Sequence, residues 1–87
     1  MSTHEHIQKL ISPKYKFGDI YKKGDLFIAD IVNFKEPTHM YYNGADIYLY
    51  GNYNELKDLK SLLDTEYKVY IYDVVEARFM EDWNHES

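Results

Sequence analysis

The stretch MYYNGADIYLY, residues 40–50, decides the fold of this chain. Apolar and aromatic residues lie on both sides of Asn43-Gly44, a pattern typical of two β-strands joined by a tight turn. Asn-Gly suits a two-residue type I′ turn, because both central residues of that turn need positive φ. Side chains alternate along a strand, so one face of the second strand is aliphatic and the other is tyrosine. The aliphatic face holds Ile47 and Leu49, and the other face holds Tyr48 and Tyr50.

A helix is predicted directly after this hairpin. Gly51 breaks the strand, and Asn52 followed by Glu55 has the spacing of a capping box. The leucines that follow form an apolar stripe at helical spacing, at positions 56, 59, 62 and 63. The sequence therefore predicts a helix near 53–64, with Leu56, Leu59 and Leu63 buried against the sheet.

Two longer apolar stretches predict further strands on either side. Residues 26–34 are apolar on both faces, which indicates a central strand covered on two sides. Asp30 interrupts one of those faces and needs either a partner or a bulge. Residues 67–79 are predicted as one long strand with a bend or bulge near Asp73. Residues 17–21 predict a further strand, which ends in a turn at 22–25.

The N-terminal residues 1–13 are interpreted as an arm or a short helix over 4–11, which ends before Pro13. The whole chain, residues 1–87, is expected to form a single domain with an acidic tail at 81–87. The predicted fold class is α+β. We expect a small curled antiparallel sheet of about five strands, in the manner of a small barrel or roll, with one helix near 53–64 and a second short one as the alternative to the arm.

Composition excludes several function classes. The chain has no cysteine, so it has no disulfide, no thiolate nucleophile and no thiolate metal site. No segment looks like a signal peptide or a membrane span, and a cytoplasmic location without membrane contact is expected. No cofactor or metal ion is expected, because His4 and His6 lack a third ligand nearby in the sequence.

Catalysis is not expected either. Glu66-x-Lys68 matches the Asp/Glu-x-Lys fragment of a large nuclease fold, for which Asp46 is the nearest upstream candidate ligand. That nuclease core needs a longer chain than this one. We therefore interpret the fragment as a helix-to-strand junction with solvated charges.

Charge is distributed unevenly along the chain. Residues 1–43 hold six lysines against five acids, whereas residues 44–87 hold four bases against ten acids, and the total is −5. This balance disfavours direct binding to nucleic-acid phosphates. It favours a larger protein with a basic surface as the partner. The oligomeric state is left open.

The residues Phe17-Gly18-Asp19-Ile20, which follow Lys14 and Lys16, resemble the opening strand of many small SH3-like barrels. Such barrels occur in translation factors, Tudor-type readers and small phage proteins. The resemblance implies an alternative function as an SH3-like nucleic-acid or ribonucleoprotein module that uses the lysine-rich segment 9–23. A homo-oligomeric structural subunit joined through its sheet edges is the other alternative.

The favoured interpretation is a small, acidic, non-catalytic binding protein that docks on a larger host protein and inhibits it. In composition the chain is similar to phage or mobile-element accessory proteins, including anti-defence inhibitors, some of which mimic nucleic acid with their acids. Tyrosine supplies apolar area and a polar hydroxyl, and it is enriched at interfaces. The candidate partner-binding residues are therefore aromatics and acids of the C-terminal half: Tyr70, Tyr72, Glu76, Glu81, Asp82 and Trp83, with Tyr48 and Tyr50 as secondary candidates.

Overall fold

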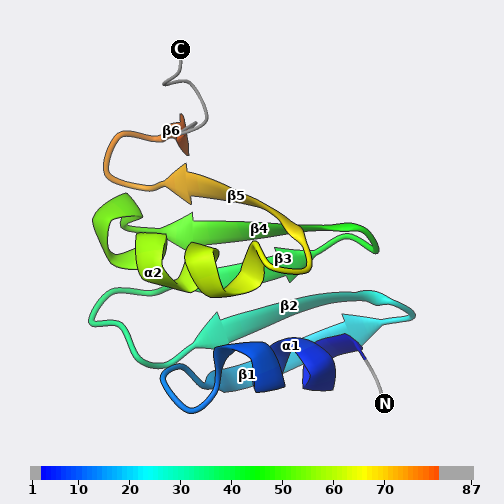
Figure 1. Cartoon of the computed structure of the whole chain (residues 1–87). Coiled ribbons are helices and arrows are strands. Elements are labelled where there is room, and N and C mark those ends of the chain that lie inside the picture. The colour runs from blue at the N-terminus through cyan, green and yellow to red at the C-terminus, as the bar shows by residue number, and fades with distance from the viewer. Residues whose placement is uncertain (1–2, 81–87) are drawn as a thin grey trace.

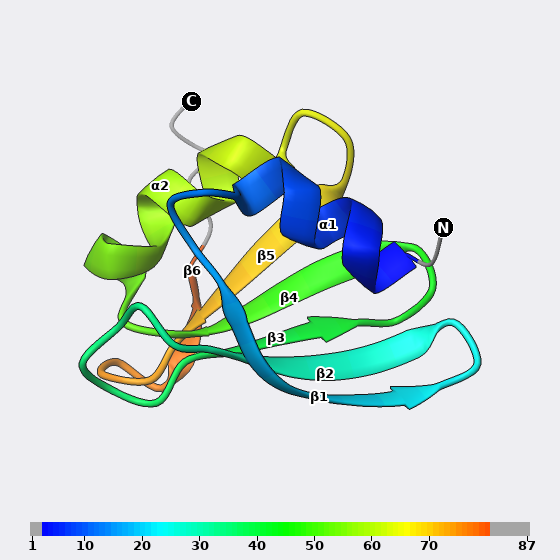
Figure 2. The same ribbon diagram turned by 90° about the horizontal axis from the view of Figure 1, so that it is seen from below.

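The structure, a computed structural model, describes residues 3–80 of the 87-residue chain. Within these residues the fold is α+β, with two helices packed on one face of a six-stranded mixed sheet (Figures 1 and 2). The strands lie across the sheet in chain order. The elements are α1 (Thr3–Ile11), β1 (Phe17–Lys23), β2 (Leu26–Ile31), β3 (His39–Tyr42), β4 (Asp46–Gly51), α2 (Tyr53–Leu63), β5 (Lys68–Asp73) and β6 (Arg78–Met80).

The hairpin between β3 and β4 forms as predicted, but its turn lies one residue later. Gly44 has a φ of 98°, whereas Asn43 is not among the residues with positive φ. Asn43 instead closes the turn with its side chain, whose Oδ1 accepts hydrogen bonds from the N–H groups of Ala45 (3.0 Å) and Asp46 (2.7 Å). Gly44 and Ala45 are therefore the central residues. A glycine with positive φ in the first central position is typical of a type II′ turn, and the predicted type I′ turn was wrong.

The sheet is mixed, and the prediction of an antiparallel sheet was wrong at one pair of strands. β4 and β5 run parallel, with Tyr48 opposite Tyr70 and Tyr50 opposite Tyr72. The reason is α2, which carries the chain back to the end of the sheet where β4 began. β1 and β6 remain the two edges, so within the described residues the sheet is not closed into a barrel.

The long strand predicted over 67–79 is two strands, because the chain reverses after Asp73. The buried Asp73 carboxylate accepts hydrogen bonds from the N–H groups of Tyr53 and Glu76, each at 3.0 Å. A short carboxylate side chain that binds nearby N–H groups favours a turn over a continuing strand. Residues 74–77 form that turn, with Ala77 at a φ of 57°, and β6 then pairs antiparallel with β5.

Both helices agree with the sequence-based expectation. Asn52 caps α2, and its side chain accepts a hydrogen bond from the N–H of Asn54 at 2.9 Å. Three of the predicted leucines are fully buried, at positions 56, 59 and 63. The N-terminal segment is a helix, not an arm, and Gln8 fixes it to the sheet by accepting a hydrogen bond from the N–H of Phe17 at 3.0 Å.

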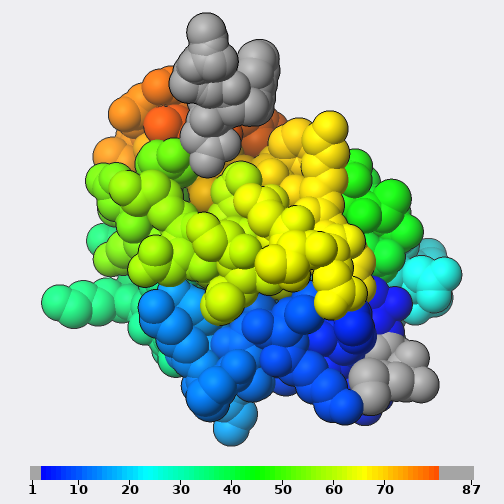
Figure 3. Space-filling view, in the orientation of Figure 1, coloured from blue at the N-terminus to red at the C-terminus, as the bar shows by residue number. Residues whose placement is uncertain are grey.

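The core lies between the helices and one face of the sheet. α1 and α2 pack side by side over that face and cover it, as the space-filling view shows (Figure 3). The opposite face has no helix against it (Figure 2). β2 is therefore covered on one side only, and the prediction of a strand covered on two sides was wrong: Phe27 and Ala29 are buried, but Leu26 and Ile28 remain 40% and 45% exposed.

Candidate functional site

The open face of the sheet carries tyrosines in two rows that cross the strands. The first row joins residues opposite one another on β1 to β5, namely Tyr21, Ile28, Tyr41, Tyr48 and Tyr70. The second joins residues on β2 to β6, namely Asp30, His39, Tyr50, Tyr72 and Phe79. We call this surface the tyrosine face, after its six tyrosines at positions 21, 41, 48, 50, 70 and 72.

The rings of the tyrosine face contact one another across neighbouring strands. Tyr48 and Tyr70 are stacked with ring centroids 5.2 Å apart, and Tyr50 and Tyr72 lie 5.6 Å apart. Phe79 meets Tyr72 edge-on at 5.1 Å. Cross-strand aromatic pairs of this kind stabilise a sheet and hold their rings in place. The four rings at 48, 50, 70 and 72 therefore form one patch, as the sequence predicts for neighbouring strands.

The tyrosine face is more apolar than the usual solvent face of a sheet. A sheet with one face on a core normally alternates apolar residues inside with polar residues outside. Here the outward positions include Tyr21, which is 71% exposed, with Ile28 at 45% and Phe79 at 44%. Contiguous apolar patches of several hundred Å² are rare on monomers and mark interaction sites.

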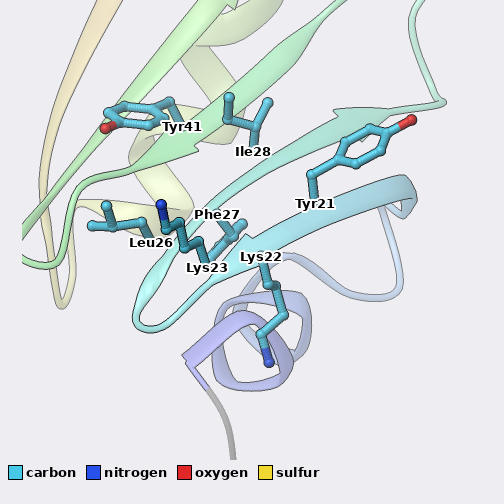
Figure 4. A pocket seen from close by; sticks show the side chains of 7 residues that line it. All are labelled: Tyr21, Lys22, Lys23, Leu26, Phe27, Ile28 and Tyr41. Atoms are coloured by element: carbon cyan, nitrogen blue, oxygen red, sulfur yellow. The ribbon is translucent and has the colours of Figure 1, made fainter.

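Three hollows follow one another along β2. The hairpin hollow, of about 230 Å³, lies at the β1–β2 turn and is lined by the residues in Figure 4: Tyr21, Lys22, Lys23, Leu26, Phe27, Ile28 and Tyr41. The central hollow, of about 490 Å³, shares Ile28 and Tyr41 with it and is completed by His39, Tyr50 and Val74. The loop hollow, of about 290 Å³, shares His39 and is lined by Asp30 and by residues of the β2–β3 loop. Each hollow shares lining residues with the next, and we call the three together the depression.

One hydrogen-bonded pair, Asp30 with His39, marks the end of this depression. Asp30 finds the partner that the sequence analysis required, because the Nδ1–H of His39 donates to its Oδ1 at 2.8 Å. Both side chains stay about half exposed, 44% for Asp30 and 47% for His39. This carboxylate lies at one end of the depression, whereas Lys22 and Lys23 lie at the other.

The structure brings together only part of the predicted partner-binding set. Tyr70 and Tyr72 lie in the tyrosine face beside the secondary candidates Tyr48 and Tyr50. Glu76 lies in the turn after β5, where its carboxylate accepts a hydrogen bond from the Arg78 Nε–H at 2.9 Å. Glu81, Asp82 and Trp83 lie outside the described residues.

Sequence reasoning missed four members of the tyrosine face: Tyr21, Ile28, Tyr41 and Phe79. Tyr41 was within reach of the sequence, since the predicted turn at Asn43-Gly44 pairs it with Asp46 and so sets it on the same face as Tyr48; in the structure, where the turn lies one residue later, Tyr41 is opposite Tyr48 itself. Phe79 was not within reach of the sequence, because one long strand was predicted over 67–79. In the structure the chain reverses after Asp73, and this reversal sets Phe79 on the open face.

Many acids of the C-terminal half lie elsewhere, on α2 and the segment that follows it, on the helix side of the sheet. Several are paired with bases: Lys60 with Asp64 at 2.7 Å, Lys14 with Asp58 at 3.7 Å and His6 with Glu66 at 2.8 Å. These acids therefore lie away from the tyrosine face, which does carry Asp30 in its second row and Asp46 two residues before Tyr48 on β4. Among the described residues, Glu76 is the one acid of the predicted partner-binding set.

Among residues 3–80, two ionisable groups have perturbed pKa values, and both have a structural role in the fold. Hydrogen bonds from backbone N–H groups, that of Tyr53 foremost, hold the pKa of Asp73 below its usual value. Burial raises the pKa of Tyr67, with smaller contributions from Tyr42 and Glu66. Asp73 joins the end of β5 to α2, so its perturbed pKa reflects structure at that junction.

The nuclease-like fragment forms no catalytic cluster in the described residues. Glu66 is bound to His6 at 2.8 Å, while Asp46 and Lys68 are paired residues on β4 and β5. Across residues 3–80, no group of three or more His, Asp and Glu side chains could hold a metal ion. Nor does this part of the chain contain a helix long and apolar enough to cross a membrane.

A comparison with models of protein families found no match, and neither did comparisons with curated proteins and with solved structures.

Proposed function

We propose that this chain is a small non-catalytic binding protein that docks on a larger protein through its tyrosine face. A single observation carries the proposal: six tyrosines, with the exposed Ile28 and Phe79, lie at least partly open to solvent on one face, where a sheet would normally present polar residues. Tyrosine and other aromatic residues concentrate at the centres of interfaces, because they bury a large area at little cost in side-chain entropy.

The size of the tyrosine face suits an interface at the small end of the usual range. The six strands are three to seven residues long. At about 3.3 Å per residue and about 4.8 Å between strands, they span roughly 500 Å² of flat surface. Stable protein complexes bury about 800 Å² on each partner. Flanking loops, such as the one that contributes to the loop hollow, would supply the remainder.

The edges of the sheet are less suited to binding than its face. β6 is three residues long, and the other edge strand, β1, has a register irregularity between Phe17 and Ile20 and ends in Lys22 and Lys23. Short strands, bulges and lysines are the features by which natural sheets avoid pairing at their edges. They favour docking on the tyrosine face over assembly through the edges.

The acids contribute long-range attraction in this proposal. With a net charge of −5, the chain is attracted to a basic protein surface and repelled by nucleic-acid phosphates. We propose that the partner is a host protein in the cytoplasm, inhibited when the tyrosine face covers its functional surface, as by phage or mobile-element accessory proteins. Trp83→Ala should then speed dissociation of the complex.

Affinity capture with two matched variants tests the proposal. Ile28→Arg places a charge on the tyrosine face, and Leu62→Arg places the same charge on α2, at a leucine that is 37% exposed. Proteins retained from host lysate by the wild-type chain and by Leu62→Arg, but not by Ile28→Arg, are the expected result of mass spectrometry. Equal retention by both variants, with both folded by circular dichroism, would remove the tyrosine face from consideration.

A further inference from the structure

We propose that the partner inserts an arginine side chain into the central hollow, with its guanidinium directed toward Asp30. The inference rests on the proposed function, since it names the chemical group that the tyrosine face receives. The occupant is thus a protein surface with a protruding arginine. Two features support it independently: the residues that line the hollow, and the charges near it.

The walls of the central hollow suit the two parts of an arginine side chain. Ile28 and Val74 offer apolar surface to its methylene stem, and Val74 is 47% exposed. Tyr41 and Tyr50 offer aromatic rings, whose faces attract the guanidinium through cation–π contact and stacking. A volume of about 490 Å³ has room for a single long side chain.

Charge along the depression is suited to a cation at one end only. His39 lines both the central and the loop hollow, and its hydrogen-bond partner Asp30 lines the loop hollow, as do Glu36 and Lys35. At the opposite end the hairpin hollow is lined by Lys22 and Lys23, which repel a cation. A guanidinium that enters between Tyr41 and Tyr50 therefore has the Asp30 carboxylate as its partner, on the side of the loop hollow.

Arginine fits this arrangement better than lysine. Its planar guanidinium stacks on aromatic rings and donates two parallel hydrogen bonds to a carboxylate, whereas the ammonium of lysine is a strongly hydrated point charge. His39 holds Asp30 by one oxygen, Oδ1, and so keeps the carboxylate next to a residue that lines the central hollow before the partner arrives.

The inference can be tested without the partner, by NMR titration of the whole ¹⁵N-labelled chain with capped tripeptides. The probes are acetyl-Gly-Arg-Gly-amide, its lysine counterpart and its citrulline counterpart, which keeps the shape of arginine and lacks the charge. We expect saturable shifts of the amides at 28, 41 and 50 with the arginine peptide. Binding of the citrulline peptide should be about tenfold weaker, because the charge-assisted hydrogen bond is lost.

Three variants locate the site. Asp30→Asn should weaken arginine binding about tenfold, and Tyr50→Leu about threefold through loss of the aromatic face. Asp46→Asn is the matched control: it removes the same charge from β4, at the end of that strand where the chain enters from the β3–β4 turn, and should leave binding unchanged. If Asp30→Asn fails to fold, Tyr50→Leu and the citrulline peptide still decide the question.

Equal binding of the arginine and citrulline peptides, or no shift on the tyrosine face at all, would overturn the inference. So would an equal effect of Asp30→Asn and Asp46→Asn. The proposed function fails separately, when Ile28→Arg and Leu62→Arg retain the same proteins. If Ile28→Arg loses capture and the arginine peptide causes no shifts, the tyrosine face remains the docking surface and only the arginine inference is overturned.

Discussion

At the scale of single residues, Asp73 links three parts of the chain through one carboxylate. It ends β5, accepts a hydrogen bond from the first residue of α2 and accepts another from Glu76 in the turn to β6. The sequence predicts only a bend or bulge near Asp73. Its role requires the distance to Tyr53, twenty positions earlier, which no local pattern reveals.

Asp73 predicts how stability depends on pH. Its pKa in the folded state lies below the usual value of 3.8, chiefly because of the hydrogen bond from Tyr53. A group with a lowered folded pKa adds stability above its unfolded pKa, and this stability is lost as the pH falls through the folded pKa. The wild-type chain should therefore lose stability in acid below about pH 4, whereas Asp73→Asn should be less stable at pH 7 and lose less on acidification. Urea denaturation at several pH values measures both effects, and parallel curves for the two proteins would contradict the assignment.

Gly44 and Ala45 form a matched pair in the hairpin turn. Gly44→Val should destabilise the fold by about 1–2 kcal/mol, because a β-branched residue resists its φ of 98°. Ala45→Val, at a neighbour without positive φ, should have a much smaller effect. Thermal denaturation compares them, and equal midpoints would mean that the turn does not require glycine.

At the scale of elements, α2 was predictable because its signals are local. The cap at Asn52 and the leucines lie within twelve residues of one another; Asn52 caps the helix as predicted, and Leu56, Leu59 and Leu63 are buried. The parallel pairing of β4 with β5 was not predicted, although the helix between the two strands is the usual connection for such a pair. For β5 to run antiparallel to β4, the chain would have had to enter β5 at the end of the sheet where β4 stops. Instead, α2 carries the chain back to the end where β4 begins.

The leucines of α2 provide a test of its packing. Leu59 is fully buried and Leu62 is 37% exposed, so the same substitution has different costs. Leu59→Ala should cost about 2–5 kcal/mol of stability, enough to threaten a domain of this size. Leu62→Ala should cost well under half as much in the same chemical denaturation experiment. A similar loss at both positions would show that the helix is rotated from the orientation described.

At the scale of the whole molecule, the fold separates two kinds of surface that the sequence analysis combined. Most strands alternate cleanly, so the tyrosines at 48, 50, 70 and 72 could be assigned to shared faces from the sequence. The sequence of a single strand does not show which face of the sheet the helices will cover, because that depends on how the whole chain packs. Two helices cover one side of the sheet, and the tyrosines lie on the other.

Glu76 tests the contribution of charge to docking. Glu76→Lys reverses a charge in the turn after β5, and Glu55→Lys makes the same change on α2. Once a partner is captured, Glu76→Lys should slow association about two- to fivefold at low salt and flatten its salt dependence, with a smaller effect from Glu55→Lys. Stopped-flow association rates measure this, and equal effects would mean that only the net charge matters.

The ten tyrosines themselves offer the most direct measurement of the central claim. Six lie on the tyrosine face, and the other four, at 15, 42, 53 and 67, are buried in or packed against the core on the helix side. NMR of the chain with ¹³C-labelled tyrosine rings, recorded with and without the captured partner, reports on all ten at once. We predict that ring signals of the six at 21, 41, 48, 50, 70 and 72 shift or broaden, while those of the other four stay in place. Perturbation of the helix-side rings, with the tyrosine face unchanged, would contradict the account.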